Sequence, residues 1–207
     1  MKLKTKMKKL FAILFLSFFT SSAFAQDAEK IGAVKKFVEE IGNKVITVAS
    51  EKQTSDSKKR EKIIAVIDAS IDAEWIARFV LGKNYKSSTE PQRERFIKLY
   101  RDFMINTYGP KFKNYNGRKF TVNEVVEQGG FYIAKSEFLP RDSNVAISVD
   151  FRVKERAGRL AILDFIAEGI SLIETQRSEF NSAISQKGTD KFLDELTERV
   201  ENLKKQK

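Results

Sequence analysis

The sequence predicts an α+β fold, in which helices gather against one curved antiparallel sheet of four strands. Two observations lead to this prediction. Four consecutive stretches between residues 119 and 166 have strand-like patterns separated by short turns, which is typical of an antiparallel meander. The stretches before residue 109 and after residue 169 instead repeat apolar residues every three or four positions, as amphipathic helices do. No internal repeat or long linker interrupts the pattern, so we expect a single domain.

The first 25 residues are expected to be a signal peptide and not part of the fold. They begin with lysines, continue with an apolar core at 10–19 and end in the small-residue motif Ala23-Phe24-Ala25. The apolar core is too short to span a bilayer, which argues against a membrane anchor. No Cys stands at the cleavage site, so a lipoprotein signal is also disfavoured. We expect cleavage after Ala25, export, and a mature domain of residues 26–207.

The composition narrows the classes of function. Without the five lysines of the signal peptide, 33 basic and 28 acidic residues remain, and this net charge of +5 suits anionic partners or simply solubility. The chain contains neither Cys nor His, so it lacks disulfides and the commonest general base and metal ligand. No catalytic, nucleotide-binding or EF-hand motif is present, and no basic patch with interleaved aromatics points to nucleic acid. The sequence contains no motif that would indicate an enzyme with a catalytic Asp/Glu pair. We expect no catalytic residue, metal site or cofactor.

The helices of the first half are predicted from apolar periodicity at 31–49, 62–71, 73–81 and 90–108. Polar residues 53–59 are expected to form a loop between the first two. Asp72 is suited to cap the third helix and Gly82 to end it. Thr89 and Gln92 have the spacing of a capping box at the start of the fourth.

The four strands are predicted at 119–126, 131–138, 145–153 and 160–166. The pair Gly129-Gly130 is expected to form the first turn and Gly158 to lie in the last one. The third strand alternates strictly, which places Asp150 and Arg152 on a solvated face opposite its apolar residues. The fourth strand is apolar on both faces, so both faces should be covered. Burying Asp164 alone in this strand would be costly, so we expect it to pair with a basic group or to accept hydrogen bonds from backbone amides.

Two further helices are predicted after the sheet. Gly169 breaks the strand pattern, and a helix entered through Ser171 is expected over 170–185. Thr189 is expected to cap a last helix, which carries an apolar stripe and ends in a basic, frayed tail.

The strands hold more apolar residues than one buried sheet face needs, and two helices add further large aromatics. A densely packed core would account for them. A cavity between sheet and helices that holds an apolar ligand is the alternative, and each ligand CH₂ that it shelters would contribute roughly 0.8 kcal/mol. The residues expected to line such a cavity are Trp75, Phe79, Phe96, Leu99, Phe103, Ile147, Val149, Phe151, Val153, Leu160 and Ile162.

The order and spacing of several short segments resemble the MlaC family, the periplasmic phospholipid-binding component of the Mla lipid transport system, also called the toluene-tolerance auxiliary family. The resemblance extends over nearly all of the mature chain. The segments are Trp75–Gly82, Pro91–Ile97, Thr107-Tyr108, Val149–Arg152, Gly158-Arg159, Asp164, Glu168–Leu172 and Arg177–Phe180. One departure is Gln176, where we expect the family to carry an aromatic residue.

The resemblance implies a periplasmic carrier that buries the acyl chains of a phospholipid and leaves its head group largely outside. Its partners would be an inner-membrane ABC complex with an MCE-domain ring and an outer-membrane lipoprotein associated with porins. Its role would be to keep phospholipid out of the outer leaflet of the outer membrane, without catalysis. We expect a monomer, in which Arg177 contacts a phosphate or an acidic partner, or is simply a solvated surface residue. The competing hypothesis is an exported structural or adaptor protein with a filled core and no ligand.

Overall fold

The computed structural model describes residues 20–108, 117–141 and 143–205. Its helices are α2 (Thr20–Ala49), α3 (Asp56–Ser70), α4 (Ala73–Leu81), α5 (Asn84–Ser87), α6 (Glu90–Tyr108), α7 (Leu172–Lys187) and α8 (Thr189–Lys205), and its strands are β1 (Gly117–Gln128), β2 (Phe131–Pro140), β3 (Ile147–Arg156), β4 (Arg159–Ala167) and β5 (Ile170–Ser171). Most of the predicted signal peptide, residues 1–19, lies outside the described residues. The helix predicted to start at residue 31 already begins at Thr20.

The described strands form one open antiparallel sheet in the order β1-β2-β3-β4-β5. The α+β class and the meander of four strands are therefore confirmed, but the predicted strand number was one too low. The missed strand, β5, pairs Ile170 with Ala167 across a tight turn in which both Glu168 (φ 49°) and Gly169 (φ 79°) have positive φ angles. Two residues are too few to show a strand period, which is why the sequence pattern did not reveal it.

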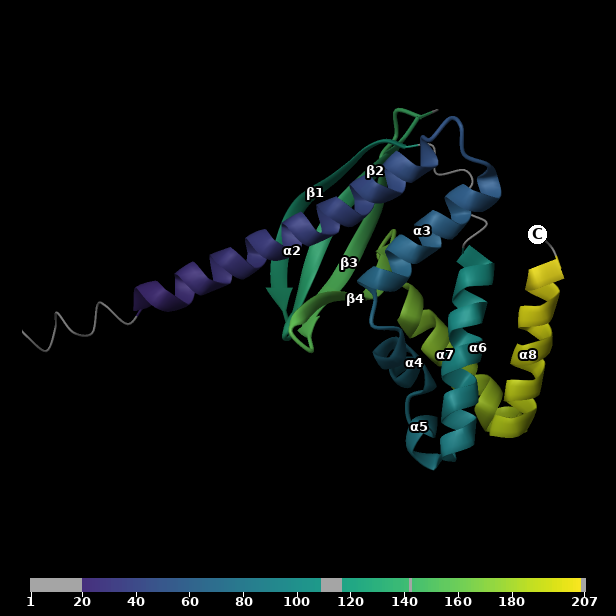
Figure 1. Cartoon of the computed structure of the whole chain (residues 1–207). Helices are drawn as coiled ribbons and strands as arrows, with labels where there is room; N and C mark the ends of the chain where they lie inside the picture. The colour runs from purple at the N-terminus through teal and green to yellow at the C-terminus, as the bar shows by residue number, and fades with distance from the viewer. Residues whose placement is uncertain (1–19, 109–116, 142, 206–207) are drawn as a thin grey trace, which may run out of the picture.

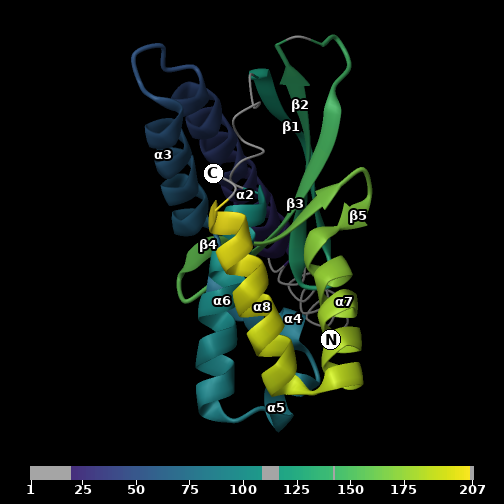
Figure 2. The same cartoon turned by 90° about the vertical axis from the view of Figure 1, so that its right-hand side faces the viewer.

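Helices cover the sheet on both faces, but unevenly (Figures 1 and 2). Helix α2 lies across one face over β1 and β2, and α3 joins it over β4. Helices α4 and α7 pack against β4 from the other face, while α6 and α8 run side by side at that end of the molecule. The prediction that β4 is covered on both faces is thus confirmed. Register shifts in β1–β2 and in β3–β4 mark bulges, which bend the sheet.

Local capping chemistry sets several helix boundaries as predicted. The Asp72 carboxylate accepts from the Trp75 amide at 2.9 Å and starts α4, and Gly82, with φ 60°, ends it. At the start of α6, the Thr89 amide donates to the Gln92 side chain at 2.9 Å and the Gln92 amide donates to the Thr89 hydroxyl at 3.4 Å, so both halves of the predicted capping box are present. The predicted loop over 53–59 was wrong in part, because Ser55 caps α3 and the polar residues from Asp56 onward are already helical.

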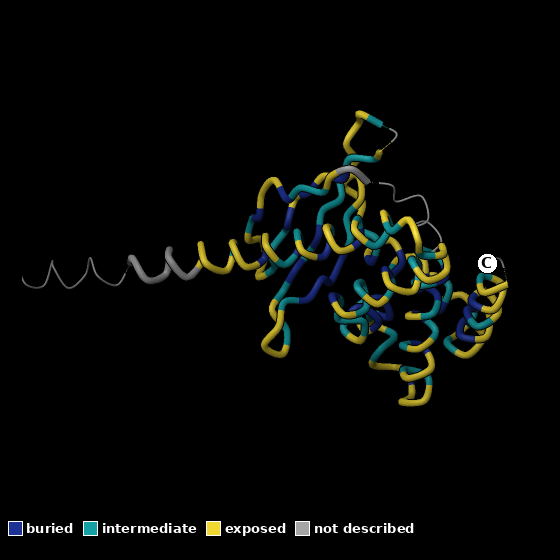
Figure 3. Tube along the Cα trace, turned by 45° about the horizontal axis from the view of Figure 1, so that its top comes forward, coloured by how far each residue is buried: buried dark blue, intermediate teal, exposed yellow. Residues whose placement is uncertain are grey.

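The buried apolar residues form two separate clusters (Figure 3). The helical cluster comes from α4, α6, α7 and α8 and contains Ile76, Ala77, Val80, Leu81, Phe96, Tyr100, Phe103, Ile173, Phe180, Ile184, Phe192, Leu193, Leu196 and Val200. The sheet cluster lies between α2 and the strands and contains Val34, Val38, Ile41, Val122, Val125, Ala134, Phe151, Val153 and Ile162. Ile71, in the connection between α3 and α4, packs against both.

Candidate functional site

The structure divides the residues predicted to line a cavity between these two clusters. Trp75, Phe79, Phe96, Leu99 and Phe103 belong to or pack against the helical cluster. The sheet cluster contains or contacts most of the others: Val149, Phe151, Val153, Leu160 and Ile162. Ile147 lies at the start of β3 with 42% of its surface exposed. The apolar face of β3 thus shares a cluster with residues of α2, whereas the predicted residues of α4 and α6 belong to the helical cluster.

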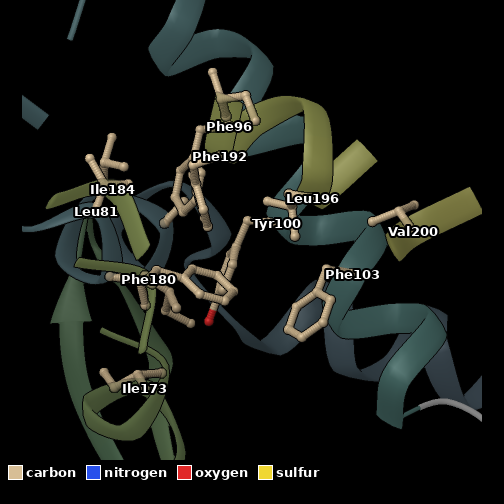
Figure 4. Packing of buried hydrophobic residues seen from close by; sticks show 14 residues of the cluster. Leu81, Phe96, Tyr100, Phe103, Ile173, Phe180, Ile184, Phe192, Leu196 and Val200 are labelled. Atoms are coloured by element: carbon tan, nitrogen blue, oxygen red, sulfur yellow. The ribbon is translucent and has the colours of Figure 1, made fainter. Parts of the chain in front are cut away.

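The helical cluster is a closed aromatic core around Phe180 (Figure 4). The Phe180 ring centroid lies 5.2 to 6.2 Å from the centroids of Phe96, Tyr100, Phe103 and Phe192. None of these five side chains is more than 5% exposed. Offset and edge-to-face rings at such distances are the preferred packing of aromatic groups. Phe96 and Phe103 thus serve as core residues here.

Gln176, the position where the chain departs from the expected family pattern, is buried beside this core. Its side-chain amide accepts a hydrogen bond from the Tyr100 hydroxyl and donates to the Tyr108 hydroxyl and to Met104 Sδ, both at 3.2 Å. Burial raises the pKa of Tyr100 above its ordinary value. A polar residue is tolerated at this depth because its donors and its acceptor are all used.

The aromatic rings of the sheet cluster are less deeply buried than those around Phe180. Phe151 lies at its centre, with the rings of Phe120 and Phe165 at 5.9 and 5.4 Å. Partly buried apolar side chains also border the helical cluster, among them Trp75, Phe79 and Leu99. Those that pack against the sheet cluster are Ile31, Phe37, Val66, Phe120, Tyr132, Val149, Leu160 and Phe165. Some apolar side chains between α2 and the sheet are thus partly exposed to solvent. The aromatic rings around Phe180, in contrast, are buried.

A glycine in α2 sets how closely this helix approaches the sheet. A Cβ atom built on Gly42 would lie 2.2 Å from Cδ1 of Phe120 on β1, far inside any normal contact distance. The Phe120 ring therefore lies directly against the backbone of α2. Because glycine has no Cβ, α2 can lie this close to the apolar face of the sheet at Gly42.

The large apolar side chains most exposed among the described residues lie at one end of the sheet. They are Val145, Ile147 and Ile170, with 74%, 42% and 66% of their surfaces exposed, and we call them the apolar rim. Strand pairing brings them to the same end, because Val149 pairs with Ala167 and the Glu168 amide donates to the Ser148 carbonyl at 3.4 Å. The apolar rim therefore continues from the strands whose other residues contact the sheet cluster.

Asp164 joins the sheet to the start of α7 and is fully buried. Its carboxylate accepts from the Ser171 hydroxyl at 2.6 Å and the Ile173 amide at 3.3 Å, and it lies 3.7 Å from the Arg152 guanidinium. Burial raises the pKa of Asp164, while these hydrogen bonds and the positive charge of Arg152 oppose the rise. The prediction that Asp164 would pair with a basic group or accept from backbone amides is confirmed, because it lies near Arg152 and accepts from the Ile173 amide. Asp150, in turn, accepts from the Ser136 amide at 3.1 Å.

Arg177 is engaged with the end of α4. Its guanidinium donates to the Phe79 carbonyl at 2.8 Å and lies 4.5 Å from the centroid of the Phe79 ring. It also lies 3.2 Å from the place where a Cβ on Gly82 would stand, so a larger residue at position 82 would press on it. Contact of Arg177 with a head group or partner stays a prediction. In the structure, the residue caps a helix carbonyl.

No group of three or more Asp, Glu, Cys or His residues within 20–108, 117–141 and 143–205 could hold a metal ion. None of the helices described for these ranges is both long and apolar enough to cross a membrane.

Comparison with known proteins identifies the family. The model of the MlaC protein family matches residues 39–198, which is well over half of the chain. The chain belongs to the MlaC family. Among curated proteins, it is 22% identical over 130 residues to the intermembrane phospholipid transport system binding protein MlaC of Haemophilus influenzae. It is 20% identical over 126 residues to the toluene tolerance protein ttg2D of Pseudomonas putida.

These matches leave part of each relative uncovered. They include 61% and 60% of this chain, and the chain spans 61% and 59% of the length of the two relatives. A solved structure covers more. The phospholipid-binding protein from Ralstonia solanacearum, in complex with a phospholipid, matches 82% of this MlaC-family chain and 97% of its own, with a TM-score of 0.72 at 17% identity. The fold is therefore the same across nearly the whole of that protein.

Proposed function

We propose that this MlaC-family chain is an exported phospholipid carrier. The observation that carries the proposal is the apolar face of the sheet, where large side chains remain partly exposed beneath α2. The Ralstonia protein of the same fold holds a phospholipid, and the Haemophilus relative is named as the binding protein of a phospholipid transport system. The carrier would bind its cargo without cofactor or catalysis.

The acyl chains would lie between α2 and the strands, against Val149, Phe151, Val153, Leu160 and Ile162. Partly packed side chains can move aside at lower cost than the interlocked rings of the helical cluster, because fewer contacts are lost. Each buried CH₂ contributes roughly 0.8 kcal/mol, so one long acyl chain would provide useful affinity without a polar anchor. The head group would remain outside, next to the apolar rim.

The family suggests where the carrier works. We propose a monomer in the periplasm, released by cleavage after Ala25, that moves lipid between an inner-membrane ABC complex with an MCE-domain ring and an outer-membrane lipoprotein–porin complex. Its role would be to maintain the lipid asymmetry of the outer membrane. N-terminal sequencing of the exported protein tests the cleavage site, since a first residue other than Gln26 would contradict it.

Native mass spectrometry tests the cargo. The protein, purified from the periplasm without detergent, should carry one phospholipid per chain, which organic extraction would identify. Phe151→Asp should abolish the adduct, because a carboxylate would be buried among the acyl chains. Val126→Asp, in β1 on the opposite face of the sheet, is the matched control and should keep it. A wild-type protein that carries no lipid and takes none from labelled vesicles would favour the adaptor with a filled core.

A further inference from the structure

Exposure falls stepwise along the apolar face of β3, from the apolar rim towards the β3–β4 turn. Ile147 is 42% exposed, Val149 is partly buried, Phe151 is 8% exposed and Val153 is fully buried. These side chains follow one another at every second position, so they lie in a row on one face of the strand. An apolar ligand can share surface with the residues near the rim, but none is left to share at Val153.

Backbone contacts hold the buried end of this row in place. Val153 pairs directly with Ile162 of β4, which is 1% exposed. Ile162 forms a parallel bridge with Ile71 in the connection between α3 and α4, and its carbonyl accepts from the Asp72 amide at 3.4 Å. The Arg159 guanidinium donates to the Ile71 carbonyl at 3.2 Å and ties the same connection to the hairpin. The pair of Val153 and Ile162 is therefore fixed more firmly than the residues nearer the rim.

The length of the row matches that of an acyl chain. Six residues separate Ile147 from Val153, which corresponds to about 20 Å of strand. The hydrocarbon core of a bilayer is about 30 Å thick, so the acyl chains of one leaflet extend about 15 Å. From the other side, only Leu160 lies on this face of β4 between Ile162 and the turn, about 7 Å of strand, which is too short for such a chain. An acyl chain on this face therefore enters at the rim and ends near the buried pair.

We propose that Val153 and Ile162 form a stop that selects phospholipids by the length of their acyl chains. The inference rests on the proposed phospholipid cargo and narrows its site, because Leu160 then lies behind this acyl stop. A chain that just reaches the acyl stop buries all of its CH₂ groups. A longer chain leaves CH₂ groups in water at the rim, and each of them forgoes about a fourfold gain in affinity. The preferred cargo is the phospholipid whose chains match the distance from rim to stop.

Native mass spectrometry after lipid exchange tests the acyl stop. The exported protein is incubated with vesicles of equal parts dimyristoleoyl-, dipalmitoleoyl- and dioleoyl-phosphatidylglycerol, whose chains are successively longer, and is then separated from them. The measured quantity is the ratio of dioleoyl to dimyristoleoyl lipid among lipid-bound molecules. Val153→Leu extends the acyl stop into the path and should lower this ratio about fourfold, whereas Val153→Ala should raise it about fourfold. If Val153→Leu does not fold, the opposite shift in Val153→Ala still decides the question.

Two comparisons separate the acyl stop from a general loosening of the core. Val80 is as fully buried as Val153 but belongs to the helical cluster, so Val80→Leu and Val80→Ala should leave the ratio unaltered. Val149→Leu, nearer the rim on the same face, should shift the ratio less than Val153→Leu. An unchanged ratio in the Val153 variants, or an equal shift in Val149→Leu, would overturn the acyl stop while lipid binding stands. A wild-type protein that takes up none of the three lipids would overturn the phospholipid proposal itself, and the acyl stop with it.

Discussion

The helical cluster and the sheet cluster are built from similar residues but packed in different ways. Around Phe180, five aromatic rings enclose one another and none exceeds 5% exposure. Around Phe151, by contrast, the rings of Phe120, Tyr132 and Phe165 are only partly buried, and the residues of the apolar rim are exposed at the end of the same strands. The difference agrees with the proposed function, in which the helical cluster is a fixed core and acyl chains share the apolar surface of the sheet cluster.

The largest change in the free energy of unfolding is expected for Phe180→Ala, which tests whether the helical cluster is the fixed core. The substitution removes a ring from the centre of an interlocked core, so it should lower the free energy of unfolding by about 3–5 kcal/mol. Urea unfolding measures the change. Phe151→Ala should cost less, since the neighbouring side chains of the sheet cluster can relax into the space.

The two variants should also differ in lipid content. Phe180→Ala should retain wild-type lipid per folded molecule, whereas Phe151→Ala should lose much of it. If Phe151→Ala proved the more destabilising variant and kept its lipid, the sheet cluster would be the fixed core and the division proposed here would be reversed.

The second effect concerns Gly42, which allows α2 to lie against Phe120. Alanine favours a helix over glycine by about 1 kcal/mol, but its Cβ would collide with the Phe120 ring. Overpacking of this kind costs about 1–3 kcal/mol, so we expect Gly42→Ala to be destabilising by about 1 kcal/mol in urea unfolding. Adding Phe120→Leu should make the alanine favourable. An alanine that stabilises the wild-type background would show that α2 moves away from the sheet easily.

Several local features of the fold could be predicted from the sequence alone. Capping predictions at Asp72, Gly82 and Thr89 succeeded because they depend on neighbours a few positions apart. The expectation for Asp164 succeeded because a buried lone charge is costly wherever it lies.

The residues of the predicted lining are distributed over both clusters, which the sequence did not indicate. Phe96 and Phe151 are both large, apolar and periodic, and periodicity shows which face is buried but not which element covers it. That residues of α2 and β3 share one cluster depends on long-range packing, including the approach of Gly42 to Phe120 on β1. No local signal in the sequence encodes it.

A third prediction uses Asp164, which links the sheet to α7. Because burial raises its pKa in the folded protein, its contribution to stability is greatest below its usual pKa of 3.8 and is lost as the pH rises towards the higher folded value. The free energy of unfolding of wild type minus that of Asp164→Asn should therefore fall with rising pH across this range. Urea unfolding at a series of pH values measures it. A difference that grew with pH would mean that Arg152 and the hydrogen bonds outweigh burial.

The smallest change in stability is expected at the apolar rim. Ile170→Ser replaces a side chain that is 66% exposed, so the free energy of unfolding should move by less than about 0.5 kcal/mol. If the rim is where acyl chains enter the sheet cluster, the same substitution should slow uptake of fluorescent phospholipid from vesicles while leaving the final amount bound unchanged. Val126→Ser, on the other face of the sheet, is the control and should alter neither. A stable Ile170→Ser variant with wild-type uptake would move the entry point elsewhere along α2.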